Sequence, residues 1–277
     1  MAIVGRSMAI VADSYTLWIV CSLQFWCQNI IGIFAMILGP ISQMQNNSLY
    51  YSGKATDRLP MNTKLPHITV QMPVYKESLD GVLAPTIESV NKAIAVYELQ
   101  GGTANLLISE DGMQIISEAE REKRLEYYDV HSCNWIARPG HNQNGYIRKG
   151  RFKKASNLNE TCLLSLRVEQ LMEQFSAQSP DSENIYAAAL EQALEETEGR
   201  IWAAGDVRIG DIILIIDSDT RIPEDCFLDA ASEMAACPEV AVIQHCSGVM
   251  YVADHYFERM IGFFTEVVNY SISWTVS

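Results

Sequence analysis

Two aspartates in this sequence have the spacing and the setting of ligands for a divalent cation. Asp217 and Asp219 directly follow the aliphatic run 212–216, which is typical of a strand covered on both faces of a parallel sheet. Such sheets bind ligands at the carboxyl ends of their strands. Two carboxylates at this spacing can reach one Mg²⁺ or Mn²⁺ ion together with ligand phosphates. The structural alternative is a turn, because Asp is common in turns and Pro223 follows.

A basic segment in an acidic chain adds a second sign of an anionic ligand. The sequence has 20 Lys and Arg against 34 Asp and Glu, a net charge of −14, yet no acidic residue occurs from 130 to 159. That segment contains Gly140, Gly145 and Gly150, so it can fold closely around a ligand, and a local basic segment favours an anion such as a diphosphate. A solvated basic surface and a contact with anionic lipid beside a membrane helix are the alternatives. The basic residues are Arg138, Arg148, Lys149, Arg151, Lys153 and Lys154.

Two further turns place carboxylates after predicted strands. The segment 73–77 (PVYKE) follows the predicted strand 67–72, and the segment 109–112 (SEDG) follows the predicted strand 105–108. Each is typical of an ordinary turn when taken alone. Because the ends of parallel strands share one edge of a sheet, their convergence with the aspartates at 217 and 219 favours a binding site.

The elements that must position these residues alternate between strand and helix. We expect strands at 67–72, 105–108, 135–137, 212–216 and 240–244, and helices at 85–100, 115–128, 155–178, 183–198 and 225–236. The helix at 115–128 is strongly charged and is expected to be exposed. This alternation predicts an α/β fold with a mostly parallel sheet and helices on both faces.

The motifs, in their order, resemble those of family 2 glycosyltransferases. PVYKE (73–77), SEDG (109–112), KASNLN (154–159) and DSDT (217–220) are similar to segments of membrane-bound cellulose-synthase-like and mannan-synthase-like enzymes, particularly those of fungal type. The resemblance covers about residues 67–247. It implies a GT-A fold, in which a Rossmann-like, mostly parallel sheet binds a nucleotide sugar.

The resemblance also implies roles for individual residues. Asp111 matches the aspartate that contacts the nucleobase, and Lys154 lies near the diphosphate. Asp217 and Asp219 match the metal-binding DxD pair, with Mg²⁺ or Mn²⁺ as the cofactor. The nucleotide-sugar-binding set implied in this way is Pro73, Tyr75, Glu77, Asp111, Lys154 and Asp217.

The implied activity is transfer of a sugar from a UDP-sugar or GDP-sugar to a carbohydrate acceptor, by an inverting, metal-dependent displacement. An inverting enzyme needs a base near the acceptor hydroxyl. The family's TED-type and Q-x-x-R-W motifs do not follow the predicted strand 240–244, so the catalytic base stays unassigned.

The chain therefore looks like the donor-binding half of such an enzyme. The alternative is a truncated or inactive, membrane-anchored donor-binding or regulatory protein. A haloacid-dehalogenase-type phosphatase is disfavoured by Arg221, which stands where that family has Thr or Val.

An uncharged stretch predicts a membrane anchor. No charged residue occurs between Asp13 and Lys54, and the apolar run 17–38 is long enough to cross ~30 Å of hydrocarbon. A soluble core helix and a signal peptide are the alternatives. The basic residues after the run place the rest of the chain in the cytosol. Gln24 and Gln28 share one helix face, which suits a partner transmembrane helix or subunit.

Composition sets the outer limits and the organisation of the chain. The net charge of −14 excludes a generally basic nucleic-acid binder, and 48% hydrophobic residues exclude a disordered chain. The predicted organisation is a lead (1–14), a transmembrane helix (15–42), a linker (43–66), a GT-A domain (67–247) with a helical surface insertion at about 160–205, and an apolar segment (248–277) that is an interfacial helix or the start of a further region.

Overall fold

The computed structural model describes residues 16, 18–20, 22–27, 29–34, 37, 56–143, 145–148, 153–178, 184–245, 247–253 and 255–276. The chain divides into two compact units. One unit is Arg58–Ala231, and the other combines Met1–Asp57 with Ser232–Ser277. The predicted GT-A domain therefore corresponds mainly to the first unit, which contains the predicted binding residues.

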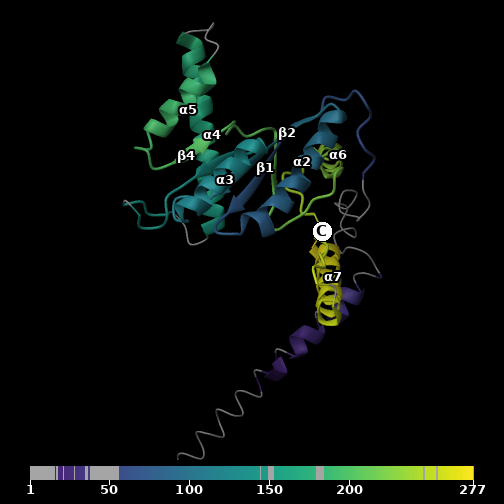
Figure 1. The fold of residues 1–277 in the computed structure, drawn as a ribbon. Helices are drawn as coiled ribbons and strands as arrows, with labels where there is room; N and C mark the ends of the chain where they lie inside the picture. The colour runs from purple at the N-terminus through teal and green to yellow at the C-terminus, as the bar shows by residue number, and fades with distance from the viewer. Residues whose placement is uncertain are drawn as a thin grey trace, which may run out of the picture. The chain divides into compact units, whose positions relative to one another are not determined.

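A five-stranded sheet forms the centre of the first unit (Figure 1). Its strand order is β4-β3-β2-β1-β5, and all pairs are parallel except that between β3 and β4. The mostly parallel α/β sheet predicted from the sequence is thus confirmed. The strands are β1 (His67–Val74), β2 (Thr103–Glu110), β3 (Asn134–Ala137), β4 (Trp202–Ala204) and β5 (Ile212–Ile215).

The register brings three strand ends to one edge of this sheet. β1 and β2 pair along their whole length, from His67 opposite Thr103 to Val74 opposite Glu110. β5 pairs with β1 up to Ile215 opposite Gln71, and the backbone N–H of Ile216 donates to the Gln71 carbonyl at 3.2 Å. The turns that follow these strands consequently start close to one another.

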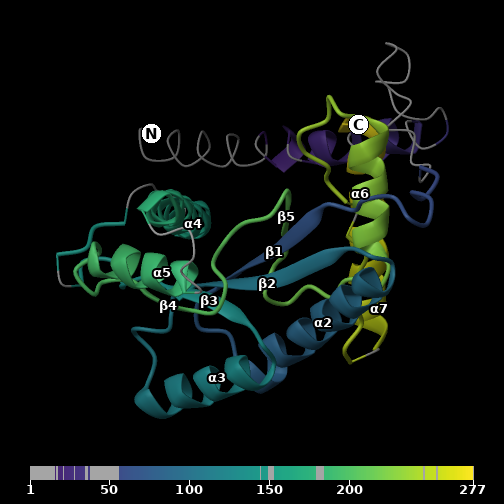
Figure 2. The same cartoon turned by 90° about the horizontal axis from the view of Figure 1, so that it is seen from above.

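Helices cover both faces of the sheet (Figure 2). The π-helical turn η2 (Leu79–Leu83) leads into α2 (Ala84–Leu99), and α2 and α3 (Glu118–Val130) lie on one face. α4 (Lys153–Gln178) and α5 (Ile185–Glu195) lie on the other face. A further helix, α6 (Cys226–Ala236), begins in the first unit.

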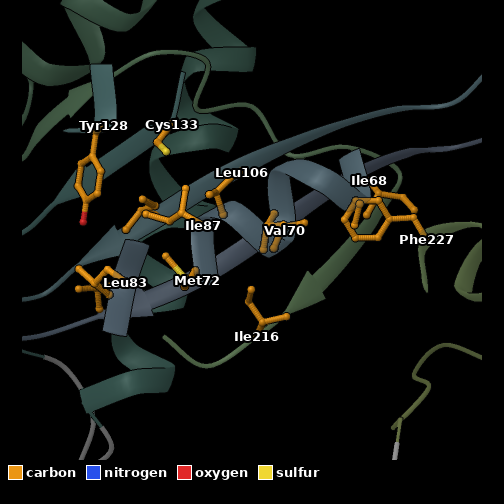
Figure 3. Close-up of a cluster of buried hydrophobic side chains, with 14 of the residues drawn as sticks. Ile68, Val70, Met72, Leu83, Ile87, Leu106, Tyr128, Cys133, Ile216 and Phe227 are labelled. Atoms are coloured by element: carbon orange, nitrogen blue, oxygen red, sulfur yellow. The ribbon is translucent and has the colours of Figure 1, made fainter. Parts of the chain in front are cut away.

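The main core lies between β1, β2 and the helices of the first face (Figure 3). Alternate residues of β1 point into it, as expected for a strand whose side chains have period two. Ile68, Val70 and Met72 are at most 1% exposed and pack with Ile87 of α2. Phe227 of α6 belongs to the same core, with its ring edge-on to that of Tyr97.

A second core lies on the opposite face. Leu107 and Ile136 of the sheet pack against Leu164 and Val168 of α4. Within the segment 160–205, α4 and α5 are helical as predicted, but their buried residues pack in this second core, and β4 from the same segment joins the sheet.

The edge strand β5 differs from the expectation that the run 212–216 is covered on both faces. Ile213 is 41% exposed and Ile215 is 55% exposed. β5 lies at the edge of the sheet, and these two residues alternate with Ile212 and Leu214, which pack against the main core, so only one face of β5 is covered within the described residues. The antiparallel strand β4 was missed by sequence reasoning because its three residues are too few for a periodic pattern.

The second unit contains no counterpart of the predicted strand 240–244. These residues are irregular, and Val242 is 80% exposed, because no strand among the described residues pairs with them. The segment 248–277, predicted to be an interfacial helix or the start of a further region, contains the helix α7 (Tyr256–Val276). The described residues between 16 and 37 are also helical, and the ring of Phe25 stacks on that of Phe264 at 5.7 Å.

The predicted lead, 1–14, lies outside the described residues, as do parts of the predicted transmembrane helix and of the linker. Within the part of the chain that is described, no helix combines the length and the apolar character needed to cross a membrane.

Candidate functional site

An open pocket of about 380 Å³ lies at the carboxyl ends of β1, β2 and β5. All of the residues predicted to bind the nucleotide sugar or the metal line it, although they come from four separate stretches of the sequence. The lining residues are Pro73, Val74, Tyr75, Glu77, Asp111, Lys154, Asn157, Asp217, Ser218 and Asp219.

The turn after β1 holds two of these residues in a local hydrogen-bonded loop. The backbone N–H of Tyr75 donates to the Glu77 carboxylate at 2.7 Å. Ser78 then caps η2, with its hydroxyl accepting from the backbone N–H of Gly81 at 3.4 Å. The turn therefore presents the Tyr75 and Glu77 side chains to the pocket before the chain enters the helical layer.

The turn after β2 depends on a close approach of two backbones. The N–H of Asp111 donates to the Val74 carbonyl at 2.7 Å. A Cβ atom at position 112 would stand 1.4 Å from the carbonyl oxygen of Tyr75, so only glycine fits there. The glycine of the SEDG motif thus lets the turns after β1 and β2 lie side by side.

Two buried arginines neutralise Asp111. Arg138 Nε donates to Asp111 Oδ1 at 2.7 Å, and Arg148 Nη2 lies 2.5 Å from the same oxygen. Arg138 is 1% exposed and the Arg148 side chain 6%. These two members of the basic segment therefore pair with a carboxylate of the protein, although the charge pattern of the segment predicted that they would serve a ligand.

The remaining described part of the basic segment reaches the pocket through α4. Lys154 lines the pocket, and its ammonium pairs with Asp217; both side chains are about half exposed. Asn157, one turn further along, is 3% exposed and donates to the Ser109 carbonyl at 2.6 Å. This hydrogen bond from the KASNLN motif joins the start of α4 to the end of β2. Lys149 and Arg151 lie outside the described residues.

Asp217 and Asp219 form a turn and line the pocket at the same time. The N–H of Thr220 donates to the Asp217 carbonyl at 3.0 Å, which confirms the turn, and both aspartates line the pocket. Among the described residues, no group of three or more His, Cys, Asp or Glu side chains could hold a metal. Mg²⁺ commonly binds one or two carboxylates and completes its shell with water and substrate phosphates. The pair Asp217 and Asp219 fits that kind of site.

A buried charge network below the pocket was not predicted. Glu110, the last residue of β2, is fully buried and accepts from Arg124 Nη1 at 3.1 Å and from the Tyr128 hydroxyl at 2.6 Å. Burial raises the pKa of the Glu110 carboxyl, and Arg124 and Tyr128 oppose that rise. Arg124 and Tyr128 are the buried residues of α3, four apart on one helix face. That i, i+4 spacing was the available sequence signal in an otherwise charged helix.

The comparisons with known proteins support one class of enzyme. Residues 212–277 match the family model described as glycosyl transferase family group 2. The matched segment begins at β5 and includes Asp217 and Asp219. The match supports a glycosyltransferase of family 2, a class that implies a nucleotide-sugar donor and a carbohydrate acceptor. The mostly parallel α/β sheet with flanking helices is consistent with a GT-A fold.

The comparison with curated proteins and the comparison with solved structures gave no match.

Proposed function

We propose that this protein is a membrane-bound glycosyltransferase of the cellulose-synthase-like and mannan-synthase-like, fungal type. It transfers a sugar from a UDP-sugar or GDP-sugar to a carbohydrate acceptor, with inversion and with Mg²⁺ or Mn²⁺ as cofactor. The observation that carries this proposal is the pocket that gathers residues of all four motifs at the carboxyl ends of three parallel strands. Nucleotide ligands bind at this edge in α/β sheets.

The pocket has two chemically different sides, which suit the two parts of a nucleoside diphosphate. Asp111 follows β2 and Asp217 follows β5, and β1 lies between these strands. Two strand spacings place the ends of β2 and β5 roughly 10 Å apart. This is about the distance between the nucleobase and the diphosphate of one nucleotide. Tyr75, Glu77 and Asp111 therefore bind the nucleoside part in our proposal, with Asp111 held in place by Arg138 and Arg148.

Lys154, Asp217 and Asp219 form the diphosphate side. A divalent cation bound there supplies positive charge that stabilises the leaving nucleoside diphosphate. Asp217 and Asp219 would hold that cation, and the Lys154 ammonium provides a second positive charge at the same edge of the pocket. Lys154 pairs with Asp217, so it also balances the charge of this carboxylate.

The proposed location is a membrane, with the anchor at 15–42 and the pocket on the cytosolic side. The absence of charge between Asp13 and Lys54 supports the anchor, and the basic residues that follow support the orientation. A partner transmembrane helix or subunit would satisfy the amides of Gln24 and Gln28. Because no catalytic base is assigned, a donor-binding or regulatory protein without turnover is the second candidate.

Titration of UDP and GDP into the full chain in mild detergent, with and without Mn²⁺, tests the proposal. We expect metal-dependent binding of at least one nucleotide, weakened about tenfold or more by D217N/D219N, because the variant loses both anionic ligands. The matched control is D225N/D229N. This pair also removes two carboxylates, but they contact Arg58 and do not line the pocket.

Failure of the wild-type chain to bind either nucleotide with metal would overturn the proposal. If binding is present, release of nucleoside diphosphate from a UDP-sugar or GDP-sugar in the presence of oligosaccharide acceptors supports the transferase. Binding without any turnover supports the donor-binding or regulatory protein instead.

A further inference from the structure

Arg124 links the pocket to a helix whose charge pattern predicts exposure to solvent. It lies in α3 and is 5% exposed, so the protein buries a full guanidinium group. A buried charge is costly unless it is paired and hydrogen-bonded. Arg124 meets this requirement through Glu110, whose two carboxylate oxygens lie 3.1 and 3.3 Å from Nη1.

The second arm of the same guanidinium reaches the turn after β1. Arg124 Nη2 donates to the backbone carbonyl of Glu77 at 2.5 Å. Glu77 lines the pocket, and its carboxylate accepts from the N–H of Tyr75, another lining residue. Arg124 itself does not line the pocket. Its fork therefore connects the end of β2 to the turn that follows β1 without itself forming part of the pocket wall.

The geometry of this contact needs arginine. The planar guanidinium can donate from Nη1 to the Glu110 carboxylate and from Nη2 to the Glu77 carbonyl at the same time, whereas the ammonium of lysine is a single point charge. Tyr128, one helical turn after Arg124, donates to Glu110 at 2.6 Å and so holds the carboxylate that orients the guanidinium. The network is buried and each of these groups has a partner, which is the condition for a rigid arrangement.

We propose that Arg124 is a positioning residue of the donor pocket. It holds the Tyr75–Glu77 turn in the conformation that receives the nucleoside, and Glu110 and Tyr128 hold Arg124. This inference rests on the proposed nucleotide binding. The effect of Arg124 on affinity is confined to the nucleoside part of the ligand. The diphosphate side of the pocket is built from Lys154, Asp217 and Asp219, which lie on other elements.

The test compares two ligands on the full chain in mild detergent. The double variant R124L/E110Q removes the guanidinium and the carboxylate together, so no unpaired charge is left buried. We expect its affinity for UDP or GDP with Mn²⁺ to fall about tenfold, because displacing the Tyr75–Glu77 turn costs about one hydrogen bond between this turn and the nucleoside. We expect its affinity for inorganic pyrophosphate with Mn²⁺ to stay unchanged. R124K, which keeps the charge and lacks the fork, should show the same split.

The control variant is K123M, which changes the neighbouring residue of α3. Lys123 pairs with Asp80 at 2.5 Å, and both side chains are more than half exposed. This variant should bind both ligands as the wild type does. Nucleotide affinity equal to the wild type in R124L/E110Q and R124K would overturn the inference, and so would an equal loss for nucleotide and pyrophosphate. A wild-type chain that binds no nucleotide would instead overturn the proposed function.

Discussion

At the scale of single residues, Gly112 shows how little room the pocket leaves for change. The backbone of this residue passes so close to Tyr75 that a Cβ would lie 1.4 Å from the Tyr75 carbonyl oxygen. That oxygen belongs to the backbone, so a substitution at position 112 must move either the turn after β1 or the turn after β2. Because both turns line the pocket, the position of their side chains depends on the absence of one carbon atom.

G112A should therefore weaken binding of UDP or GDP with Mn²⁺ by about tenfold or more, since several pocket contacts shift together. Isothermal titration of the full chain measures the change. G81A is the matched control, because a Cβ at that position meets only the Ser78 side chain at 3.5 Å, an ordinary contact. Nucleotide binding by G112A at wild-type strength would show that the turns adapt without cost.

Asp111 shows, also at this scale, why charge counts in a sequence can mislead. The basic segment from 130 to 159 suggested cations held out to a ligand. Arg138 and Arg148 in fact pair with Asp111 inside the protein. The pairing fixes the carboxylate at the pocket wall, where both of its partners are buried.

At the scale of elements, α3 matters because it carries Arg124 and Tyr128. The helix begins with a capping box: the Ser117 hydroxyl accepts from the N–H of Glu120 at 3.4 Å, and the Glu120 carboxylate accepts from the N–H of Ser117 at 3.3 Å. These bonds satisfy backbone donors that the first helical turn leaves unpaired. The cap thus helps to set where α3 begins and which of its faces meets the sheet.

S117A should lower the free energy of unfolding by about 1 kcal/mol, the usual cost of losing such a cap. The bonds from Ser117 hold the pKa of the Glu120 carboxyl below its ordinary value of 4.5. A lowered pKa in the folded state stabilises the fold above the ordinary value, and that contribution disappears as the pH falls through the lowered pKa. Urea unfolding at neutral and at acid pH should therefore show a difference between wild type and S117A that shrinks in acid. S117T, which keeps the capping hydroxyl, should stay close to the wild type. A pH-independent difference would contradict this role for Glu120.

At the scale of the whole molecule, the unit Arg58–Ala231 contains both cores and the complete pocket. The buried members of the main core run from Ile68 to Ala231, and those of the second core from Leu107 to Val207. A compact unit with its own core can in principle fold alone. The α6 helix extends to Ala236, which sets a natural end for such a fragment.

Residues 58–236 expressed alone should unfold in one cooperative thermal transition and bind nucleotide with metal as the full chain does, within about threefold. Circular dichroism and titration calorimetry measure the two properties. The same fragment with D217N/D219N provides the control for specific binding. A fragment that lacks a cooperative transition would show that this unit depends on the rest of the chain for its fold.

The sequence alone determined the elements whose signals are local. Alternating or continuous apolar runs located β1, β2, β3 and β5, and helical periodicity and turn residues located α2 to α6, with ends that differ from the structure by a few residues. The first strand was predicted to end at residue 72, but β1 continues to Val74. The predicted binding residues also come together, because the ends of parallel strands must share one edge of the sheet.

Only the tertiary structure decided which partners these elements meet. An aliphatic run such as 212–216 looks the same in a central strand and in the edge strand β5, because the pattern records local preference and not neighbours. The run 240–244 has the composition of a strand, yet it is irregular because a strand forms only where another pairs with it. The pairings of Arg124 with Glu110 and of Arg138 with Asp111 join residues 14 and 27 positions apart. Their identity follows from packing, which local patterns do not contain.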